Sequence, residues 1–120
     1  MKRILVVDDS VTMRQLMKMV ILKHLACQIT EAQDGLDALS KLKEGAFDLI
    51  VTDVNMPRMD GLGLVRSVRE GLKSTVPIII VTTKGAEADR DTGLKLGANA
   101  YLTKPINGIQ VIKTVNELLG

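Results

Sequence analysis

Acidic, hydroxyl and lysine side chains follow four short, largely apolar runs of this 120-residue chain. In chain order they are Asp8-Asp9, Asp53, Thr82-Thr83 and Thr103-Lys104-Pro105. Short runs rich in β-branched residues are typical of strands buried in a parallel sheet, and ligands bind beyond the carboxyl ends of such strands. The pattern therefore predicts three carboxylates, a threonine hydroxyl and a lysine at one edge of a sheet.

Three carboxylates that lie close together repel one another, so their gathering calls for a compensating charge. Mg²⁺ (or Mn²⁺) would supply it, since Mg²⁺ prefers oxygen ligands and typically takes one or two carboxylates with a phosphate oxygen. One carboxylate would then be free to attack phosphorus, while the lysine and a threonine hydroxyl bind the phosphoryl oxygens. These residue types thus indicate phosphoryl transfer to an aspartate.

Each residue also has an ordinary structural role. An aspartate after a strand often caps the next helix or begins a turn, and this alternative applies to Asp8-Asp9 in particular. A threonine at a strand end is common, and a lysine before proline usually lies in a solvated loop. Independent caps would not be expected at the same edge in three strands, so the conjunction favours a site.

Apolar spacing predicts the elements that position this edge. Three strongly apolar runs predict central strands, and two mixed runs predict edge strands, in this chain order: Ile4–Val7, Gln28–Ala32, Leu49–Val51, Ile78–Val81 and Ala100–Thr103. Strands that alternate with helices predict right-handed βαβ units, hence an α/β fold with a parallel sheet covered on both faces. The order 2-1-3-4-5 of a doubly wound, flavodoxin-like (βα)5 fold follows. Residues 1–120 are expected to form a single domain with no output domain.

The helices are predicted from apolar residues at i, i+3, i+4 and i+7. Asp34 is the expected N-cap of the second helix, and the more polar fourth helix, Glu87–Leu96, is expected to end at Gly97. The other four helices have these expected buried positions: Met13, Leu16, Met17 and Val20; Leu36, Leu39 and Leu42; Val65, Val68 and Leu72; Ile109, Ile112, Val115 and Leu119.

Composition excludes several classes of protein. A hydrophobic content of 46% excludes a disordered chain, and one Tyr, one Phe and no Trp leave few platforms for stacking a base or a flavin. The 16 basic and 14 acidic residues are interspersed, so no direct nucleic-acid binding is expected. Cys27 is the lone cysteine and cannot form an internal disulfide, so nothing indicates an oxidising compartment. The first apolar run is too short for a signal peptide or a membrane span. We expect a cytoplasmic protein without membrane insertion.

Six motifs occur between Ile4 and Pro105. They are Val7-Asp8-Asp9-Ser10 with Thr12-Met13-Arg14, Glu31-Ala32-Gln33-Asp34-Gly35, Asp53-Val54-Asn55-Met56-Pro57 with Met59-Asp60-Gly61, Val81-Thr82, Gly97-Ala98 and Tyr101-Leu102-Thr103-Lys104-Pro105. In type, order and spacing the chain resembles the response-regulator receiver domains, and most closely the single-domain regulators of chemotaxis. The resemblance implies a two-component switch that takes a phosphoryl group from the phosphohistidine of a histidine kinase in a Mg²⁺-dependent reaction.

The resemblance also implies a role for individual residues. The phosphoacceptor would be Asp53; the metal ligands Asp8, Asp9, Asp53 and the backbone carbonyl of Asn55; the phosphate-binding residues Thr82 and Lys104; the switch residues Thr82 and Tyr101; and the cis peptide bond that of Lys104 and Pro105. Thr83 competes with Thr82 for the hydroxyl role, but the spacing to Tyr101 and Lys104 favours Thr82. Asn55 and Lys84 would tune the lifetime of the phosphoryl group, and Lys84 is basic where the chemotaxis regulators have an acid.

Such a protein is not an enzyme in the usual sense, because it would catalyse only its own phosphorylation and dephosphorylation. Phosphorylation would switch the surface formed by the fourth helix, the fifth strand and the fifth helix. The expected partners are a histidine kinase and a downstream protein, such as the flagellar motor or another signalling protein, and a monomer is expected.

Three alternative functions fit the residues less well. A phosphohydrolase with an aspartyl nucleophile needs a second aspartate two residues further on, where this chain has Asn55. A flavin-binding protein needs a phosphate-cradling loop after the first strand, where Asp8-Asp9 would repel a phosphate. A degenerate receiver that serves only as a scaffold would not need the intact set of acids, threonine and lysine.

Overall fold

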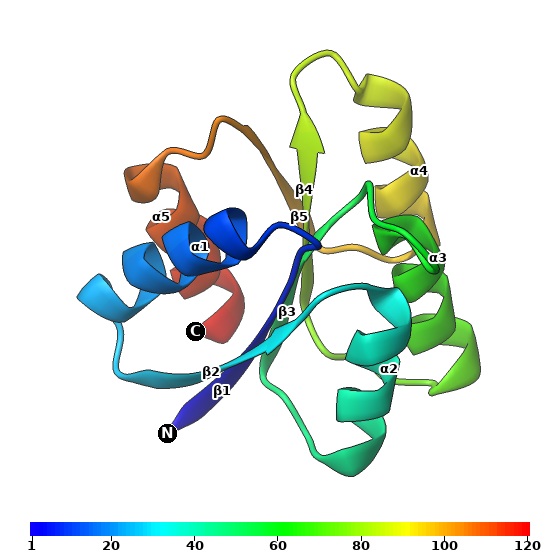
Figure 1. Ribbon diagram of the computed structural model, residues 1–120, viewed down its shortest axis with the longest axis horizontal. Helices are drawn as coiled ribbons and strands as arrows, with labels where there is room; N and C mark the ends of the chain where they lie inside the picture. Colours follow the sequence, from blue (N-terminus) through cyan, green and yellow to red (C-terminus); the bar gives the residue numbers. More distant parts are fainter.

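A computed structural model describes residues 1–120, and a five-stranded parallel sheet forms its centre (Figure 1). The strands are β1 (Lys2–Val7), β2 (Cys27–Ala32), β3 (Leu49–Asp53), β4 (Ile78–Thr83) and β5 (Ala100–Lys104). Their order is β2-β1-β3-β4-β5, which confirms the predicted topology. The three strongly apolar runs form the central strands β1, β3 and β4. Their sequences are continuously apolar because helices cover both of their faces.

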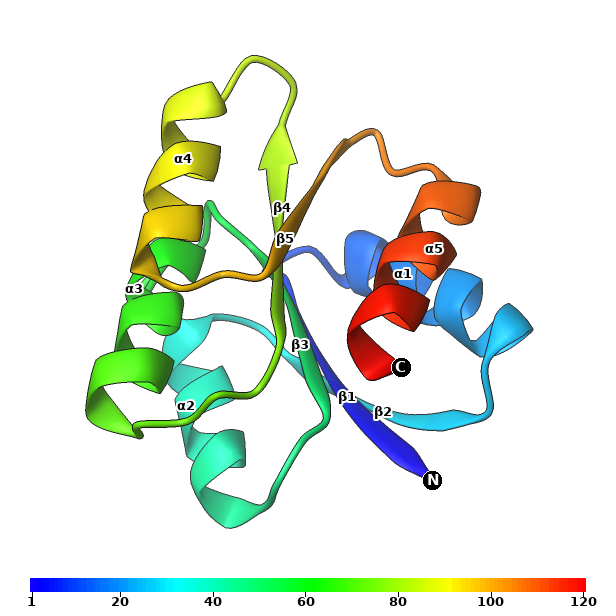
Figure 2. The same cartoon turned by 180° about the vertical axis from the view of Figure 1, so that it is seen from behind.

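Five α-helices lie in two layers against the sheet. They are α1 (Val11–His24), α2 (Gly35–Glu44), α3 (Gly61–Arg66), α4 (Glu87–Leu96) and α5 (Gly108–Leu119), and a π-helical segment, η1 (Ser67–Gly71), continues α3. Helices α1 and α5 cover one face of the sheet, and α2, α3 and α4 cover the other (Figures 1 and 2). Each layer encloses its own aliphatic core, one around Ile21 and Val111 and the other around Leu64 and Val68.

The helix ends follow the predicted caps. The side chain of Asp34 accepts a hydrogen bond from the Asp37 N–H, so it is the N-cap of α2, as expected. Helix α4 has the bounds predicted for it, Glu87–Leu96, and it ends at Gly97, whose φ of 122° is strained for any residue with a side chain. No helix is long and apolar enough to cross a membrane.

Spacing alone misjudges the burial of several apolar residues. The exposed positions that were expected to be buried are Leu16, Leu36, Leu72 and Ile109. Leu36 and Ile109 each stand two residues before a fully buried residue, Ala38 and Val111 respectively. Two helical residues subtend about 200° around the axis, so each of these side chains lies on the opposite side from the packed residue. Ile109 is 84% exposed as a result.

Candidate functional site

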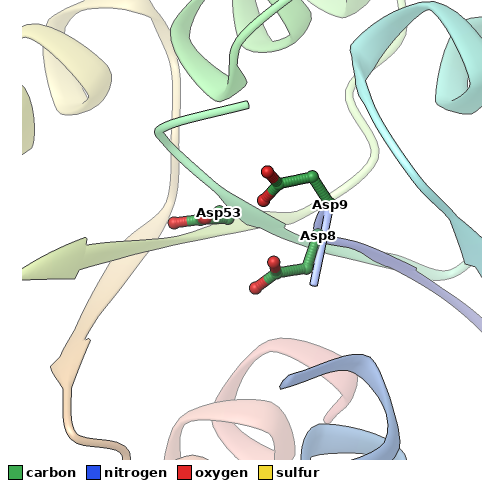
Figure 3. Close-up of side chains that lie close together, drawn as sticks. All are labelled: Asp8, Asp9 and Asp53. Atoms are coloured by element: carbon green, nitrogen blue, oxygen red, sulfur yellow. The ribbon is translucent and has the colours of Figure 1, made fainter. Parts of the chain in front are cut away.

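Three carboxylates converge at the carboxyl ends of β1 and β3. These strands are neighbours in register, with Val7 opposite Thr52, so the residues that follow in each strand meet at the same edge. Asp8, Asp9 and Asp53 each place a carboxylate oxygen within 4.8 Å of the others (Figure 3). Asp8 and Asp53 are buried and Asp9 is exposed, so the group opens toward solvent on the Asp9 side.

A single lysine offsets part of this negative charge. Lys104 Nζ lies 3.2 Å from Asp53 Oδ1 and 3.8 Å from Asp8 Oδ2. It is the last residue of β5, so it stands at the same edge of the parallel sheet, and its peptide bond with Pro105 is cis. One ammonium group pairs with two of the three carboxylates, and an excess of negative charge remains.

Burial, and to a smaller extent nearby charge, shifts the pKa of the Asp8 carboxyl. Burial raises the pKa of the Asp8 carboxyl above its usual value, and the negative charges of Asp53 and Asp9 add to this rise. The Ser10 N–H, which donates to Asp8 Oδ1 at 2.9 Å, and the ammonium of Lys104 act in the opposite direction. Oxygen ligands, excess negative charge and an open side together suit a hard divalent cation such as Mg²⁺.

The two carboxylate oxygens of Asp53 differ in their surroundings. Oδ1 accepts a hydrogen bond from the Val54 N–H at 2.9 Å and faces the ammonium of Lys104. Oδ2 accepts no hydrogen bond from a protein group, and it is not sealed from solvent. The Asp53 carboxylate is therefore held at one oxygen and has the other available for reaction.

The β3–α3 loop and Gly61, the first residue of α3, pack closely against Asp53. The Gly61 N–H donates to the Val54 carbonyl at 2.8 Å, and a Cβ at Gly61 would come within 2.1 Å of the Asp53 carbonyl oxygen. Only glycine fits this approach, which explains the glycine eight residues after the aspartate. The side chain of Asn55, in the same loop, is exposed, as is that of Lys84 after β4.

Thr82 and Tyr101 lie on the adjacent strands β4 and β5. Thr82 is buried, and its hydroxyl makes a long bond of 3.5 Å to the Leu102 carbonyl, whereas Thr83 is exposed. Tyr101 is 40% exposed, and the Arg90 guanidinium lies over its ring at 5.2 Å. Thr82 and Tyr101 both line a cavity of about 180 Å³, which Lys84 also lines.

Two arginines near the site form contacts that the sequence does not reveal. Arg14 Nη1 donates to the Asp8 carbonyl at 2.6 Å, and its Nε donates to Glu31 at 3.0 Å. Arg58 forms two bonds with the carboxylate of Asp34. Both contacts join residues from different elements, so spacing along the chain could not reveal them.

Comparison with known proteins identifies the family. The model of the response regulator receiver domain matches residues 4–116. The chain is 40% identical to chemotaxis protein CheY1 of Helicobacter pylori, over 98% of this chain and 95% of that protein. It is also 40% identical to the transcriptional regulatory protein ResD of Bacillus subtilis, over 98% of this chain but only 48% of that protein.

A solved structure shows the same likeness in three dimensions. The chemotaxis response regulator CheY4 of Vibrio cholerae superposes with a TM-score of 0.88 at 35% identity, covering 99% of both chains. With the family model spanning nearly all of the chain, this protein belongs to the response regulator receiver domains of two-component systems.

Proposed function

We propose that Asp53 accepts a phosphoryl group from the phosphohistidine of a histidine kinase, and that the chain is a phosphorylation-dependent switch. The observation that carries this proposal is the free Oδ2 of Asp53, held beside two other carboxylates and the ammonium of Lys104. Receiver domains interact with histidine kinases and with downstream targets.

The residues that would hold a divalent cation are Asp8, Asp9, Asp53 and the backbone carbonyl of Asn55. When bound, Mg²⁺ would neutralise charge on the phosphoryl oxygens during transfer. The carboxylates present suit a divalent cation, because their three oxygens lie within 4.8 Å of one another and carry more negative charge than Lys104 offsets.

The transfer itself requires little of the protein beyond position and charge. Asp53 Oδ2 would attack phosphorus while the bond from phosphorus to the imidazole nitrogen of the donor breaks, and the imidazole would keep that electron pair. The product is an aspartyl phosphate. Lys104, already 3.2 Å from Asp53 Oδ1, would pair with a phosphoryl oxygen, and Thr82 would donate a hydrogen bond to another.

The test of this function is direct phosphorylation by a small acyl phosphate in the presence of Mg²⁺. Intact mass should rise by one phosphoryl group, the label should be lost with hydroxylamine as an acyl phosphate is, and excess chelator should prevent labelling. Peptide mapping should place the label at Asp53. A label that is stable to hydroxylamine, or that forms equally well with chelator, would rule out the proposal.

Mg²⁺ is expected to stabilise the fold, because it would bind the converged carboxylates and not the unfolded chain. At about 100 times its dissociation constant the gain in the free energy of unfolding would be roughly 2.7 kcal/mol. Asp9→Asn should melt higher than wild type without metal, because it removes one of three repelling charges, and should gain less from Mg²⁺. Thermal melts with Mg²⁺ or chelator test this; identical wild-type melts would contradict a metal site here.

Phosphorylation is proposed to switch the surface of α4, β5 and α5 through Thr82 and Tyr101. The phosphoryl group adds about −1.5 to −2 charge at Asp53. The Thr82 hydroxyl could exchange its long bond to Leu102 for a phosphoryl oxygen, and the cavity beside it could then receive the Tyr101 ring.

Thr82→Ala should therefore accept the phosphoryl group yet show a weaker response around Tyr101. Amide shifts on adding a phosphoryl mimic would measure that response, with the exposed neighbour Thr83→Ala as the matched control. Shifts confined to the Asp53 pocket in wild type, or an undiminished response in Thr82→Ala, would exclude this switch.

The side chain of Lys84 is proposed to lengthen the lifetime of the phosphoryl group. On this proposal an attacking water would approach past the residues two beyond Asp53 and two beyond Thr82, which are the exposed Asn55 and Lys84. A phosphoryl oxygen paired with the Lys84 ammonium would be shielded, and an exposed ion pair of up to about 1 kcal/mol corresponds to roughly five-fold. Autodephosphorylation at fixed Mg²⁺ should be that much faster in Lys84→Glu; a slower variant would refute the role.

The downstream partner is inferred from the relatives alone. CheY1 of H. pylori and the CheY homologue of Campylobacter jejuni are named as chemotaxis proteins, and this chain spans over nine-tenths of each. We therefore favour a protein partner such as the flagellar motor over a transcriptional output. Capture of partners by wild type with and without a phosphoryl mimic tests this assignment.

A further inference from the structure

Arg58 lies near the cluster of Asp8, Asp9 and Asp53 but pairs with none of its carboxylates. Arg58 Nε lies 2.6 Å from Asp34 Oδ2, and Nη2 lies 2.9 Å from Oδ1, which is a two-bond pairing of guanidinium and carboxylate. The Asp34 side chain is only 4% exposed, whereas that of Arg58 is 54% exposed. The pair therefore has a fixed end at Asp34 and a solvated end at Arg58.

Asp34 and Arg58 share a cavity with Asp9. The cavity has a volume of about 370 Å³ and is lined by Asp9, Gln33, Asp34, Pro57 and Arg58. Asp9 and Asp34 are the only acids in this lining, and Gln33 and Pro57 carry no charge. Asp9 forms no ion pair with the protein, so it is the one other carboxylate of this cavity open to the guanidinium.

Asp34 is fixed by contacts other than Arg58. Its Oδ1 accepts the Asp37 N–H at 2.8 Å as the cap of α2. The backbone next to Arg58 is also fixed, because the Gly35 N–H donates to the Met59 carbonyl at 2.9 Å. Arg58 itself has a φ of 65°, in the left-handed region. The side chain of Arg58 thus has one hydrogen-bonded partner. Asp37, whose charge also raises the pKa of Arg58, already accepts the Gln33 N–H and pairs with Lys41, so the loss of Asp34 would free Arg58 within the shared cavity.

We propose that Asp34 is a positioning residue for metal binding, which holds the Arg58 guanidinium away from Asp9. A guanidinium and a divalent cation compete for the same carboxylate, because each neutralises its charge. With Asp34 in place, Asp9 stays available to the cation; without it, Arg58 pairs with Asp9. This inference rests on the proposed metal site and adds a residue outside the ligand set.

A purely structural role for the Asp34–Arg58 pair predicts different effects of the variants on metal binding. If the Asp34–Arg58 pair only anchors the loop that carries Asn55, then loss of either partner weakens metal binding, and loss of both is no better. If Asp34 holds off a competing cation, loss of Arg58 does not weaken metal binding, and it restores what the loss of Asp34 removes. The two roles therefore differ in two results. One is whether loss of Arg58 alone weakens metal binding, and the other is whether the double variant recovers the affinity that loss of Asp34 removes.

The experiment is Mg²⁺ titration calorimetry on the full chain with four proteins: wild type, Asp34→Asn, Arg58→Met and the double variant. Asp34→Asn should raise the dissociation constant roughly five-fold, the scale of an exposed ion pair. Arg58→Met should bind Mg²⁺ as tightly as wild type or more tightly, and the double variant should return to within about two-fold of wild type. Thermal melts report the folding cost separately, and both single variants should melt lower because each loses the same pair.

Three results would overturn the inference while leaving the metal site intact. They are an unchanged dissociation constant in Asp34→Asn, a weakened affinity in Arg58→Met, and a double variant that binds as poorly as Asp34→Asn. If wild type itself binds no Mg²⁺, the proposed metal site fails and this inference fails with it. Asp9→Asn is the reference variant when wild type does bind Mg²⁺, because its titration shows how much of the affinity depends on the carboxylate that Arg58 would take.

Discussion

Asp53→Asn is expected to abolish phosphorylation by an acyl phosphate. An amide oxygen carries no negative charge and is a far weaker nucleophile toward phosphorus than a carboxylate. Asparagine has nearly the same shape, and its Oδ1 can still accept the Val54 N–H that now bonds Asp53 at 2.9 Å. The substitution thus removes the reacting group and leaves the pocket packed.

Intact mass after incubation with the donor and Mg²⁺ measures this effect. Asp91→Asn is the matched control, because Asp91 lies on α4, is 59% exposed and pairs only with its neighbour Arg90. The control should be labelled at the wild-type rate. Labelling of Asp53→Asn at the wild-type rate would show that another residue accepts the phosphoryl group.

Lys104→Met is expected to slow phosphorylation by about 100-fold. Methionine keeps much of the length of the side chain but removes the charge that lies 3.2 Å from Asp53 Oδ1. Removal of one preorganised group that stabilises developing oxyanion charge typically costs about 10²- to 10³-fold in rate. Initial rates across a range of acyl phosphate concentrations would measure the loss.

The affinity for Mg²⁺ separates this role from simple damage to the site. Lys104 also lies 3.8 Å from Asp8, so its loss removes a cation that offsets the carboxylates, and Mg²⁺ should bind more tightly. A disordered site would instead bind Mg²⁺ more weakly. Lys113→Met, on an exposed position of α5 without an ion pair, is the control and should behave as wild type in both measurements. A wild-type phosphorylation rate in Lys104→Met would contradict the assigned role.

The fold could be predicted because its signals are local. Strands that are buried on both faces need continuous apolar runs, and helices between them need a 3.6-residue period, so both patterns are written in neighbouring residues. Chain order then decides the topology, since right-handed crossovers leave few ways to arrange five strands. The N-cap at Asp34 and the end of α4 at Gly97 were predictable for the same reason.

The gathering of the site was predictable for a related reason. Residues at the carboxyl ends of parallel strands must share one sheet edge, so Asp8, Asp53 and Lys104 meet there whatever their other contacts are. The roles that the family resemblance adds, such as those of Thr82 and Tyr101, stay predictions until the proposed experiments are done.

Contacts between elements were decided only in three dimensions. Arg58 and Asp34 are 24 residues apart and meet because the β3–α3 loop folds back on the start of α2. Arg14 reaches the Asp8 carbonyl and Glu31 for a similar reason, and Ile109 is exposed because α5 turns the other side to the sheet. The sequence by itself determined the strand order and the residues at its carboxyl edge, through periodicity and chain order. The tertiary structure alone decided which charged groups pair around that edge, because pairing depends on distances between elements that no local pattern encodes.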